Sequence, residues 1–150
     1  MIEGEQVRRA TVTWTGNLAS GSGLVSAASS GAFSELPVTW AARTESPDGS
    51  TSPEELIAAA HASCFSMAFS SALTKDGTPP GMLEVSATVT FVKDETRWSI
   101  ASSHLDVRGR VEGSSQAAFA DAAERAKDGC PVSRALKGNV ELSVSATLEG

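Results

Sequence analysis

The feature that most constrains the fold is the run 56–74, which carries no formal charge. Ser52, Pro53 and Glu55 precede it in the order of an N-cap, a first helical residue and a capping-box glutamate, so we expect a helix that begins at Pro53. The run is long enough to cross a membrane, but its alanines, serines and His61 make it too polar for a span. An uncharged helix of this length is typical of the buried central helix of a compact or oligomeric protein.

Strand and turn signals fill the rest of the chain. The strand at 82–93 alternates apolar and polar residues, and a change of phase in the next strand predicts a bulge near Ser102 and Ser103. Strands are expected at 10–15, 23–27, 36–42, 82–93, 98–111 and 140–148, and further helices at 115–127 and 131–137. The order of the main elements is β-β-β-α-β-β-α-β without βαβ alternation. We therefore expect one α+β domain, residues 1–150, with largely antiparallel sheets.

The chain holds two cysteines, Cys64 and Cys130. Two such cysteines have three possible roles: inert core residues, a structural disulfide or a redox couple. The placement of both on core-facing helix surfaces favours the redox couple. Cys64 lies in the middle of the long helix, where burial raises the pKa of a thiol and a reactive thiolate needs a cation. Arg43 is the candidate cation. From the residues alone, an edge charge that reaches solvent is the favoured interpretation of Arg43.

Cys130 lies between two predicted helices. If Pro131 begins the second one, Cys130 is its N-cap, where unpaired N–H groups favour a thiolate. A buried turn residue is the alternative. His61, three residues before Cys64, is either a catalytic base or a packed core histidine, and we favour the second because no residue is placed to orient the imidazole. His104 is expected to be an ordinary strand residue.

Charge and composition exclude several classes of function. A net charge of −6 argues against nucleic acid or an anionic membrane as the main partner. The N-terminus lacks the pattern of a signal peptide, so we expect a cytoplasmic protein, where a cycling disulfide is more plausible than a static one. Two cysteines and two histidines without ligand spacing predict no metal site.

The motifs around the cysteines resemble those of the OsmC/Ohr family, the osmotically inducible and organic hydroperoxide resistance proteins, and more closely its OsmC branch. The resemblance rests on two segments: 51–67, which reads Thr-Ser-Pro-Glu-Glu-Leu-Ile-Ala-Ala-Ala-His-Ala-Ser-Cys-Phe-Ser-Met, and 130–133, which reads Cys-Pro-Val-Ser. It implies an OsmC-like fold, a homodimer and a stress-defence peroxidase that reduces organic, and more slowly inorganic, hydroperoxides.

The resemblance also implies roles for single residues. Cys64 matches the peroxidatic cysteine and Cys130 the resolving cysteine, while Glu54 matches a glutamate that pairs with the arginine matched by Arg43. No bound cofactor is implied, and the electrons would come from an external dithiol, such as a lipoylated protein or another dihydrolipoyl-type reductant. Apolar residues near the first cysteine are candidate walls of a substrate pocket: Leu36, Phe65, Met67 and Phe69.

Helix geometry adds an argument for assembly. Ten residues of helix separate Glu54 from Cys64, about 15 Å at the usual rise per residue, which a glutamate side chain does not span. If Glu54 serves a cysteine site, it serves the site of a second subunit whose central helix runs antiparallel beside it. We therefore expect an intertwined two-fold homodimer.

Two other functions compete with a peroxidase. One is a dimer that binds an apolar ligand without catalysis, and the pair of Arg43 with Glu54 argues against it, because a passive apolar cavity has no use for a costly buried ion pair. The other is a Cys–His hydrolase that uses His61. That function would leave Cys130 without a role.

Overall fold

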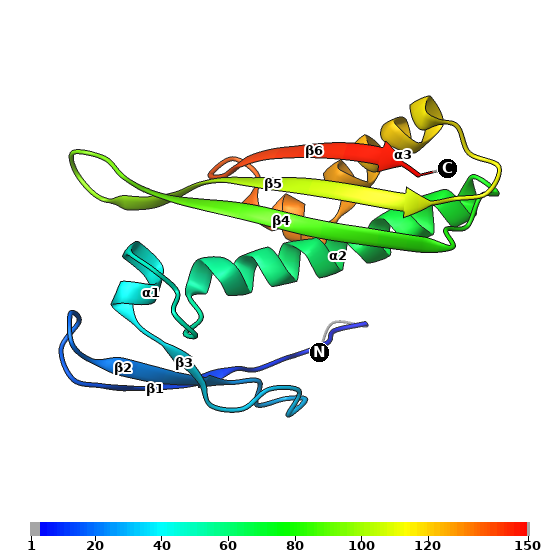
Figure 1. Cartoon of the computed structure of the whole chain (residues 1–150). Helices are drawn as coiled ribbons and strands as arrows, with labels where there is room; N and C mark the ends of the chain where they lie inside the picture. Colours follow the sequence, from blue (N-terminus) through cyan, green and yellow to red (C-terminus); the bar gives the residue numbers. More distant parts are fainter. Residues whose placement is uncertain (1–3, 150) are drawn as a thin grey trace. The chain divides into compact units, whose positions relative to one another are not determined.

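The computed structural model describes residues 4–149. The chain forms two compact units, one up to Pro53 and one from Glu54 onward. Each unit has its own three-stranded sheet, of order β1-β2-β3 in the first and β4-β5-β6 in the second. Figure 1 shows the elements of both units. The α+β class predicted from the sequence is confirmed.

The first unit is built on an antiparallel sheet of β1 (Thr11–Thr15), β2 (Ser22–Ser26) and β3 (Leu36–Val38). The first two strands lie within one residue of their predicted bounds. Gly16 ends β1 with a φ of +96°, a left-handed conformation that favours glycine. Trp14 closes the same turn, because its indole N–H donates to the Gly16 carbonyl at 2.9 Å.

The prediction of a strand through residues 36–42 is wrong in its second half. The chain turns after β3 into a short helix, α1 (Trp40–Thr44). Thr39 is its N-cap, and the Thr39 hydroxyl accepts a hydrogen bond from the Ala42 N–H at 3.0 Å. Arg43 therefore lies in the last turn of a helix and does not close a strand.

The second unit contains the long helix α2 (Pro53–Lys75), which begins at Pro53 as predicted. One side of α2 is buried and the other is exposed, as the 70 % exposure of Met67 shows. The buried residues recur four or seven positions apart, which is the spacing of one helix face: Glu54, His61, Phe65, Phe69 and Leu73.

Three strands form the second sheet: β4 (Met82–Lys93), β5 (Trp98–Arg110) and β6 (Glu141–Leu148). β4 and β5 are antiparallel, and their register shifts so that Thr90 pairs with Ser102 but Phe91 pairs with Ile100. The extra residue is Ala101, one position before the predicted bulge.

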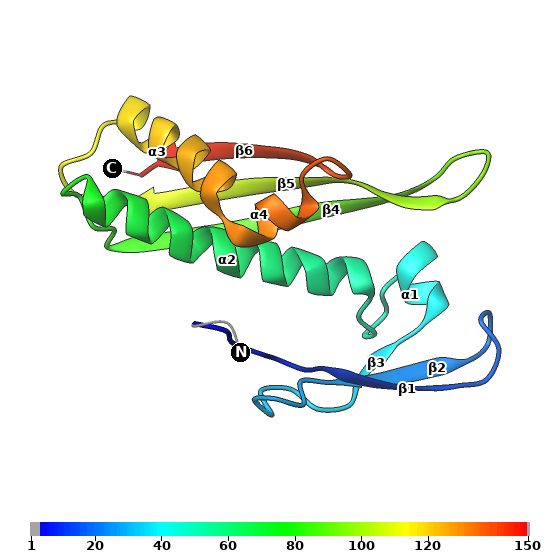
Figure 2. The same ribbon diagram turned by 180° about the vertical axis from the view of Figure 1, so that it is seen from behind.

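The sequence prediction missed one crossover. β6 runs parallel to β5, and α3 (Gln116–Gly129) and α4 (Pro131–Leu136) connect the two strands. The chain therefore does contain a β-α-β unit, although the pairings of the two sheets are antiparallel elsewhere. In Figure 2, α2, α3 and α4 lie on the same face of this sheet.

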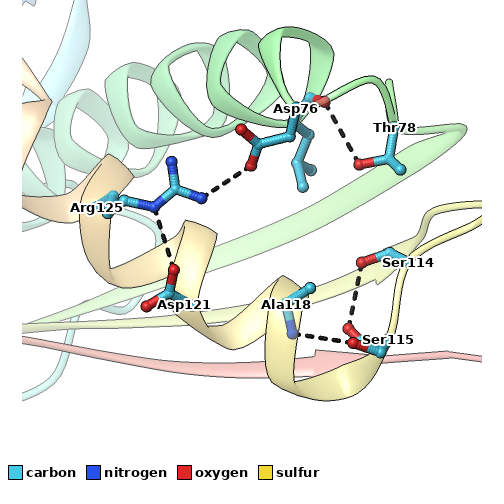
Figure 3. A network of polar contacts seen from close by, with 8 residues as sticks. Asp76, Thr78, Ser114, Ser115, Ala118, Asp121 and Arg125 are labelled. Carbon is cyan, nitrogen blue, oxygen red and sulfur yellow. Dashed lines mark hydrogen bonds and ion pairs between the residues drawn. The ribbon is translucent and has the colours of Figure 1, made fainter.

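The core of the second unit lies between the sheet and its helices. Phe69 of α2 contacts two aromatic rings. Its ring centroid is 5.4 Å from that of Phe65 in the same helix and 4.9 Å from that of Phe119 in α3. The apolar stripe predicted on α3 is confirmed, since its residues are all buried: Phe119, Ala122, Ala123 and Ala126. At the surface, Arg125 of α3 bonds Asp76 at 2.8 Å and Asp121 at 3.3 Å, and so links α3 to the end of α2 (Figure 3).

Candidate active site at two cysteines

The second unit brings Cys64 and Cys130 together. Cys64 is near the middle of α2, and Cys130 is the residue between α3 and α4, where it ends the first helix and is the N-cap of the second. Both are free cysteines, and their side chains are hydrogen-bonded to each other. Sulfur atoms in such contact need little movement to form a disulfide.

The two thiols differ in access. Cys130 is fully buried in the hydrophobic core, whereas Cys64 is only partly buried at its edge. Cys64 is therefore the thiol that a dissolved molecule meets first.

The two thiols also differ in acidity. Burial raises the pKa of Cys64, and its hydrogen bond with Cys130 raises that pKa further, against small opposing effects of the Val132 N–H and the Arg134 charge. Burial also raises the pKa of Cys130, but hydrogen bonds from Cys64 and Ser133 and the nearby N–H groups outweigh it, so the net pKa is lowered. When the reduced pair loses one proton, these opposite shifts favour the negative charge on Cys130 over Cys64.

The position of Cys130 explains the direction of its shift. As predicted, Cys130 stands at a helix N-cap, followed by Pro131 at the first helical position. The N–H groups of Val132 and Ser133 act on the sulfur and favour its anion, although neither makes an aligned cap hydrogen bond. Arg134, one turn further along, is a cation near Cys64 that the sequence analysis did not single out.

Arg43 and Glu54 belong to different units of the chain. Arg43 lies on α1 in the first unit, with its guanidinium carbon 5.8 Å from the centre of the Trp40 ring. Glu54 is in the first turn of α2 and is only 6 % exposed. A carboxylate buried to that extent is costly unless it is paired or hydrogen-bonded, and Glu54 has polar interactions. Its distance from Cys64 along α2 follows from helix geometry as about 15 Å.

The three α2 residues predicted to line a substrate pocket do not lie on one face of the helix. Phe65 and Phe69 are fully buried in the core, whereas Met67 is 70 % exposed on the other side of α2. The physical reason is helical periodicity, because residues two apart project about 200° from each other. Leu36 is partly buried on β3 in the first unit.

A buried histidine lies beside the cysteines. His61 is fully buried, as predicted for a packed core histidine, and both of its ring nitrogens are hydrogen-bonded. Nδ1 is 2.6 Å from the Ser103 hydroxyl of β5, and Nε2 is 2.8 Å from the Ser133 hydroxyl of α4. The sequence analysis missed both serines as partners, because they are 42 and 72 residues away from His61 in the chain.

Comparisons with known proteins show which family this chain resembles. Residues 46–145 match the family model described as OsmC-like protein. "Peroxiredoxin OsmC" of Escherichia coli K12 is 38 % identical over 129 residues, which cover 86 % of this chain and 89 % of that protein.

Solved structures show the same fold. The organic hydroperoxide resistance protein OhrB of Bacillus subtilis superposes with a TM-score of 0.67 at 23 % identity, over 94 % of this chain and 98 % of that one. An OsmC-like protein from Mycoplasma pneumoniae superposes with a TM-score of 0.74 at 14 % identity, over 97 % and 99 % of the two chains.

Proposed function

Because this chain belongs to the OsmC-like protein family, we propose that it is a thiol-dependent peroxidase that reduces organic hydroperoxides to alcohols. The names of its relatives, peroxiredoxin and organic hydroperoxide resistance protein, support a peroxide-related redox role at the level of the family. The observation that carries the proposal is the pair of Cys64 and Cys130, in contact, one partly exposed and the other fully buried.

In the first step Cys64 acts as the nucleophile, because it is the accessible thiol of the pair. Its thiolate attacks the distal oxygen of ROOH, so that an S–O bond forms and the O–O bond breaks. The alkoxide leaves and takes a proton to become ROH, and Cys64 becomes a sulfenic acid. Sulfur loses two electrons and the peroxide gains them.

In the second step the Cys130 thiolate attacks the Cys64 sulfur. The S–S bond forms, the S–O bond breaks, and the departing hydroxide takes a proton to become water. Because the two side chains are already hydrogen-bonded, this step competes well with further oxidation of Cys64. An external dithiol then reduces the disulfide by exchange and is itself oxidised to a cyclic disulfide. A dihydrolipoyl protein is a reductant of this class.

A cation must shift the proton away from Cys64 in the first step, because burial raises the pKa of that thiol. We assign this role to Arg43, with Glu54 fixing the guanidinium through a bidentate pair. The charge of Arg134 also acts on the Cys64 thiol and favours its thiolate. Since Glu54 is about 15 Å along the helix from its own Cys64, the proposal includes a homodimer in which each Glu54 serves the partner's cysteine.

Hydroperoxide consumption tests the proposed chemistry. Cumene hydroperoxide is mixed with the purified protein and either dihydrolipoamide or dithiothreitol, and its loss is followed for the wild type, Cys64→Ser and Cys130→Ser. We expect rapid loss with the wild type and none above the dithiol's own rate with Cys64→Ser. Cys130→Ser should complete one turnover and accumulate the Cys64 sulfenic acid, which mass spectrometry detects after trapping with dimedone.

A ligand-binding dimer gives a different result. In that case the wild type consumes no more hydroperoxide than the dithiol alone, and neither substitution changes the rate. A Cys–His hydrolase also predicts no consumption and no effect of Cys130→Ser. Either outcome rejects the peroxidase.

A further inference from the structure

A buried polar chain runs from the sheet to the second cysteine. Ser103 of β5, His61 of α2 and Ser133 of α4 are at most 1 % exposed. His61 joins the two hydroxyls, with distances of 2.6 Å at Nδ1 and 2.8 Å at Nε2. Polar groups withdrawn from water are costly, and hydrogen bonds offset that cost only when each group has a partner. In the part of the chain that the structure describes, no buried side-chain nitrogen or oxygen lacks one.

The row of hydrogen-bonded side chains ends at the Cys130 sulfur. Pro131, Val132 and Ser133 are the first three residues of α4, so Ser133 stands at the position from which a side chain reaches back to the N-cap. The Cys130 N–H already donates to the Ala126 carbonyl at 2.9 Å. The Ser133 side chain is hydrogen-bonded to the Cys130 sulfur instead.

Counting protons fixes the direction of these bonds. Burial lowers the pKa of His61, so its ring is neutral, with one nitrogen that donates and one that accepts. A serine hydroxyl has a single proton. If Nδ1 carried the ring proton, Nε2 would accept a hydrogen bond from the Ser133 hydroxyl. Ser133 would then have no proton left to donate to the Cys130 sulfur. If Nε2 carries the proton, Ser103 donates to Nδ1, Nε2 donates to Ser133, and the Ser133 proton is free for Cys130.

We propose that His61 is a positioning residue for the resolving cysteine: its Nε2–H donates to Ser133 and thereby directs the Ser133 hydroxyl proton to the Cys130 sulfur. A thiolate that accepts this proton in a hydrogen bond is stabilised, and thiolate is the form that attacks the Cys64 sulfenic acid. The lowered pKa of Cys130 agrees with this arrangement. The catalytic consequence rests on the proposed function, but the hydrogen-bond chain does not.

The thiolate of Cys130 is titrated by its absorbance at 240 nm in a Cys64→Ser background, where Cys130 is the remaining thiol. Arg134, whose charge acts on position 64, is the same in every variant. Adding Ser133→Ala removes the hydroxyl donor and should move the midpoint up by about one to two pH units, which is the usual contribution of a hydrogen bond to a charged group. Adding His61→Phe should move it in the same direction.

Two variants separate positioning from packing. His61→Gln keeps an amide N–H near the place of Nε2, so it should restore the midpoint that His61→Phe shifts. His104→Gln is the matched control, since His104 is also bonded to a serine, Ser143 at 2.6 Å, but is only partly buried and, as the residue after Ser103 in β5, points to the opposite face of the sheet. It should leave the Cys130 midpoint unchanged.

The wild-type protein offers a test that needs no substitution. The ¹⁵N shifts of His61 distinguish a proton on Nε2 from one on Nδ1, and the proposal requires Nε2. A proton on Nδ1, or a midpoint that folded Ser133→Ala leaves unchanged, overturns it. Both experiments are independent of peroxidase activity. If the wild type consumes no hydroperoxide while the midpoints move as expected, the proposed function fails and the positioning role stands.

The kinetic consequence is specific to one step. After mixing with one equivalent of cumene hydroperoxide, Ser133→Ala should form the disulfide about tenfold more slowly relative to the formation of sulfenic acid, in line with the lost hydrogen bond. An unchanged ratio of the two rates would show that Ser133 and His61 do not assist the attack of Cys130 on the Cys64 sulfenic acid.

Discussion

At the scale of single residues, the burial of His61 couples the stability of the fold to pH. Burial lowers the pKa of His61 from its ordinary value of 6.5. As pH falls through 6.5, the His61 imidazole is protonated in the unfolded chain but stays neutral in the folded chain. Proton binding therefore favours the unfolded state. Stability is therefore full above pH 6.5 and is lost as pH falls below it, by at most about 1.4 kcal/mol per pH unit for one proton.

Urea unfolding between pH 5 and pH 7.5 measures this effect. The free energy of unfolding of the wild type should decrease on acidification from pH 6.5, and His61→Gln should reduce the slope in this window. Identical slopes for the wild type and His61→Gln would show that His61 titrates alike in the folded and unfolded chain.

Gly109 is a second residue whose surroundings predict a measurable effect. A Cβ at this position of β5 would lie 2.6 Å from Phe119 Cζ and 2.9 Å from Leu83 Cδ2, closer than real contacts allow. Gly109→Ala should therefore destabilise the second unit by roughly 1–3 kcal/mol through overpacking. Thermal unfolding measures the loss. Gly129→Ala is the control, because a Cβ there meets nothing within 4 Å, and it should not destabilise the protein.

At the scale of elements, α1 depends on its cap. The helix has five residues, too few for its own hydrogen bonds to hold it, so the bond from the Ala42 N–H to the Thr39 hydroxyl carries much of its stability. Thr39→Ala should cost about 1 kcal/mol and raise the amide exchange rates of α1 about fivefold. Thr44→Ala should have a smaller effect, because that hydroxyl only donates back to the Trp40 carbonyl at 2.9 Å. Equal effects of the two changes contradict the capping role.

The elements that could be predicted are those with a long local pattern. β4 alternates over its whole length, α3 has an apolar stripe, and α2 begins at a proline, so the sequence predicted where β4 and α2 begin and placed α3 to within two residues. α1 was missed because five residues carry no clear period and Trp40 follows a strand. The parallel pairing of β5 with β6 was missed because no local pattern encodes which edge of a sheet a distant strand joins.

The candidate site shows the same division. The contact of Cys64 with Cys130 followed from placing both on core-facing helix surfaces, and the acidity of Cys130 followed from its N-cap position. The bonds of His61 to Ser103 and Ser133 depend on how β5, α2 and α4 pack. That packing is a property of the tertiary structure, so it left no signal in the sequence beyond the serine in the Cys-Pro-Val-Ser motif.

At the scale of the whole molecule, α2 is the unusual element. Contrary to the expectation that its serines and His61 make it too polar, it is long and apolar enough to cross a membrane by length and composition alone. Only 22 % of its most apolar window is buried within one chain. Its exposed residues include a row of small side chains around Met67, spaced three or four apart along one face: Ala60, Ser63, Met67, Ser71 and Thr74. Small residues allow two helices to approach closely. This surface is suited to a second copy of α2, which is the arrangement that the proposed role of Glu54 requires.

Light scattering tests this assembly. We expect a mass of two chains of 15.4 kDa each at micromolar concentration. Met67→Glu should shift the protein toward one chain, because the substitution places a carboxylate in the middle of the covered surface, where burying an unpaired charge costs several kcal/mol. Ala117→Glu is the matched control: residue 117 is exposed on α3, on the side that already carries Asp121 and Glu124, so the mass should not change. A wild-type mass of one chain rejects the dimer. It also rejects the proposal that Glu54 of one subunit acts at the cysteine site of the other.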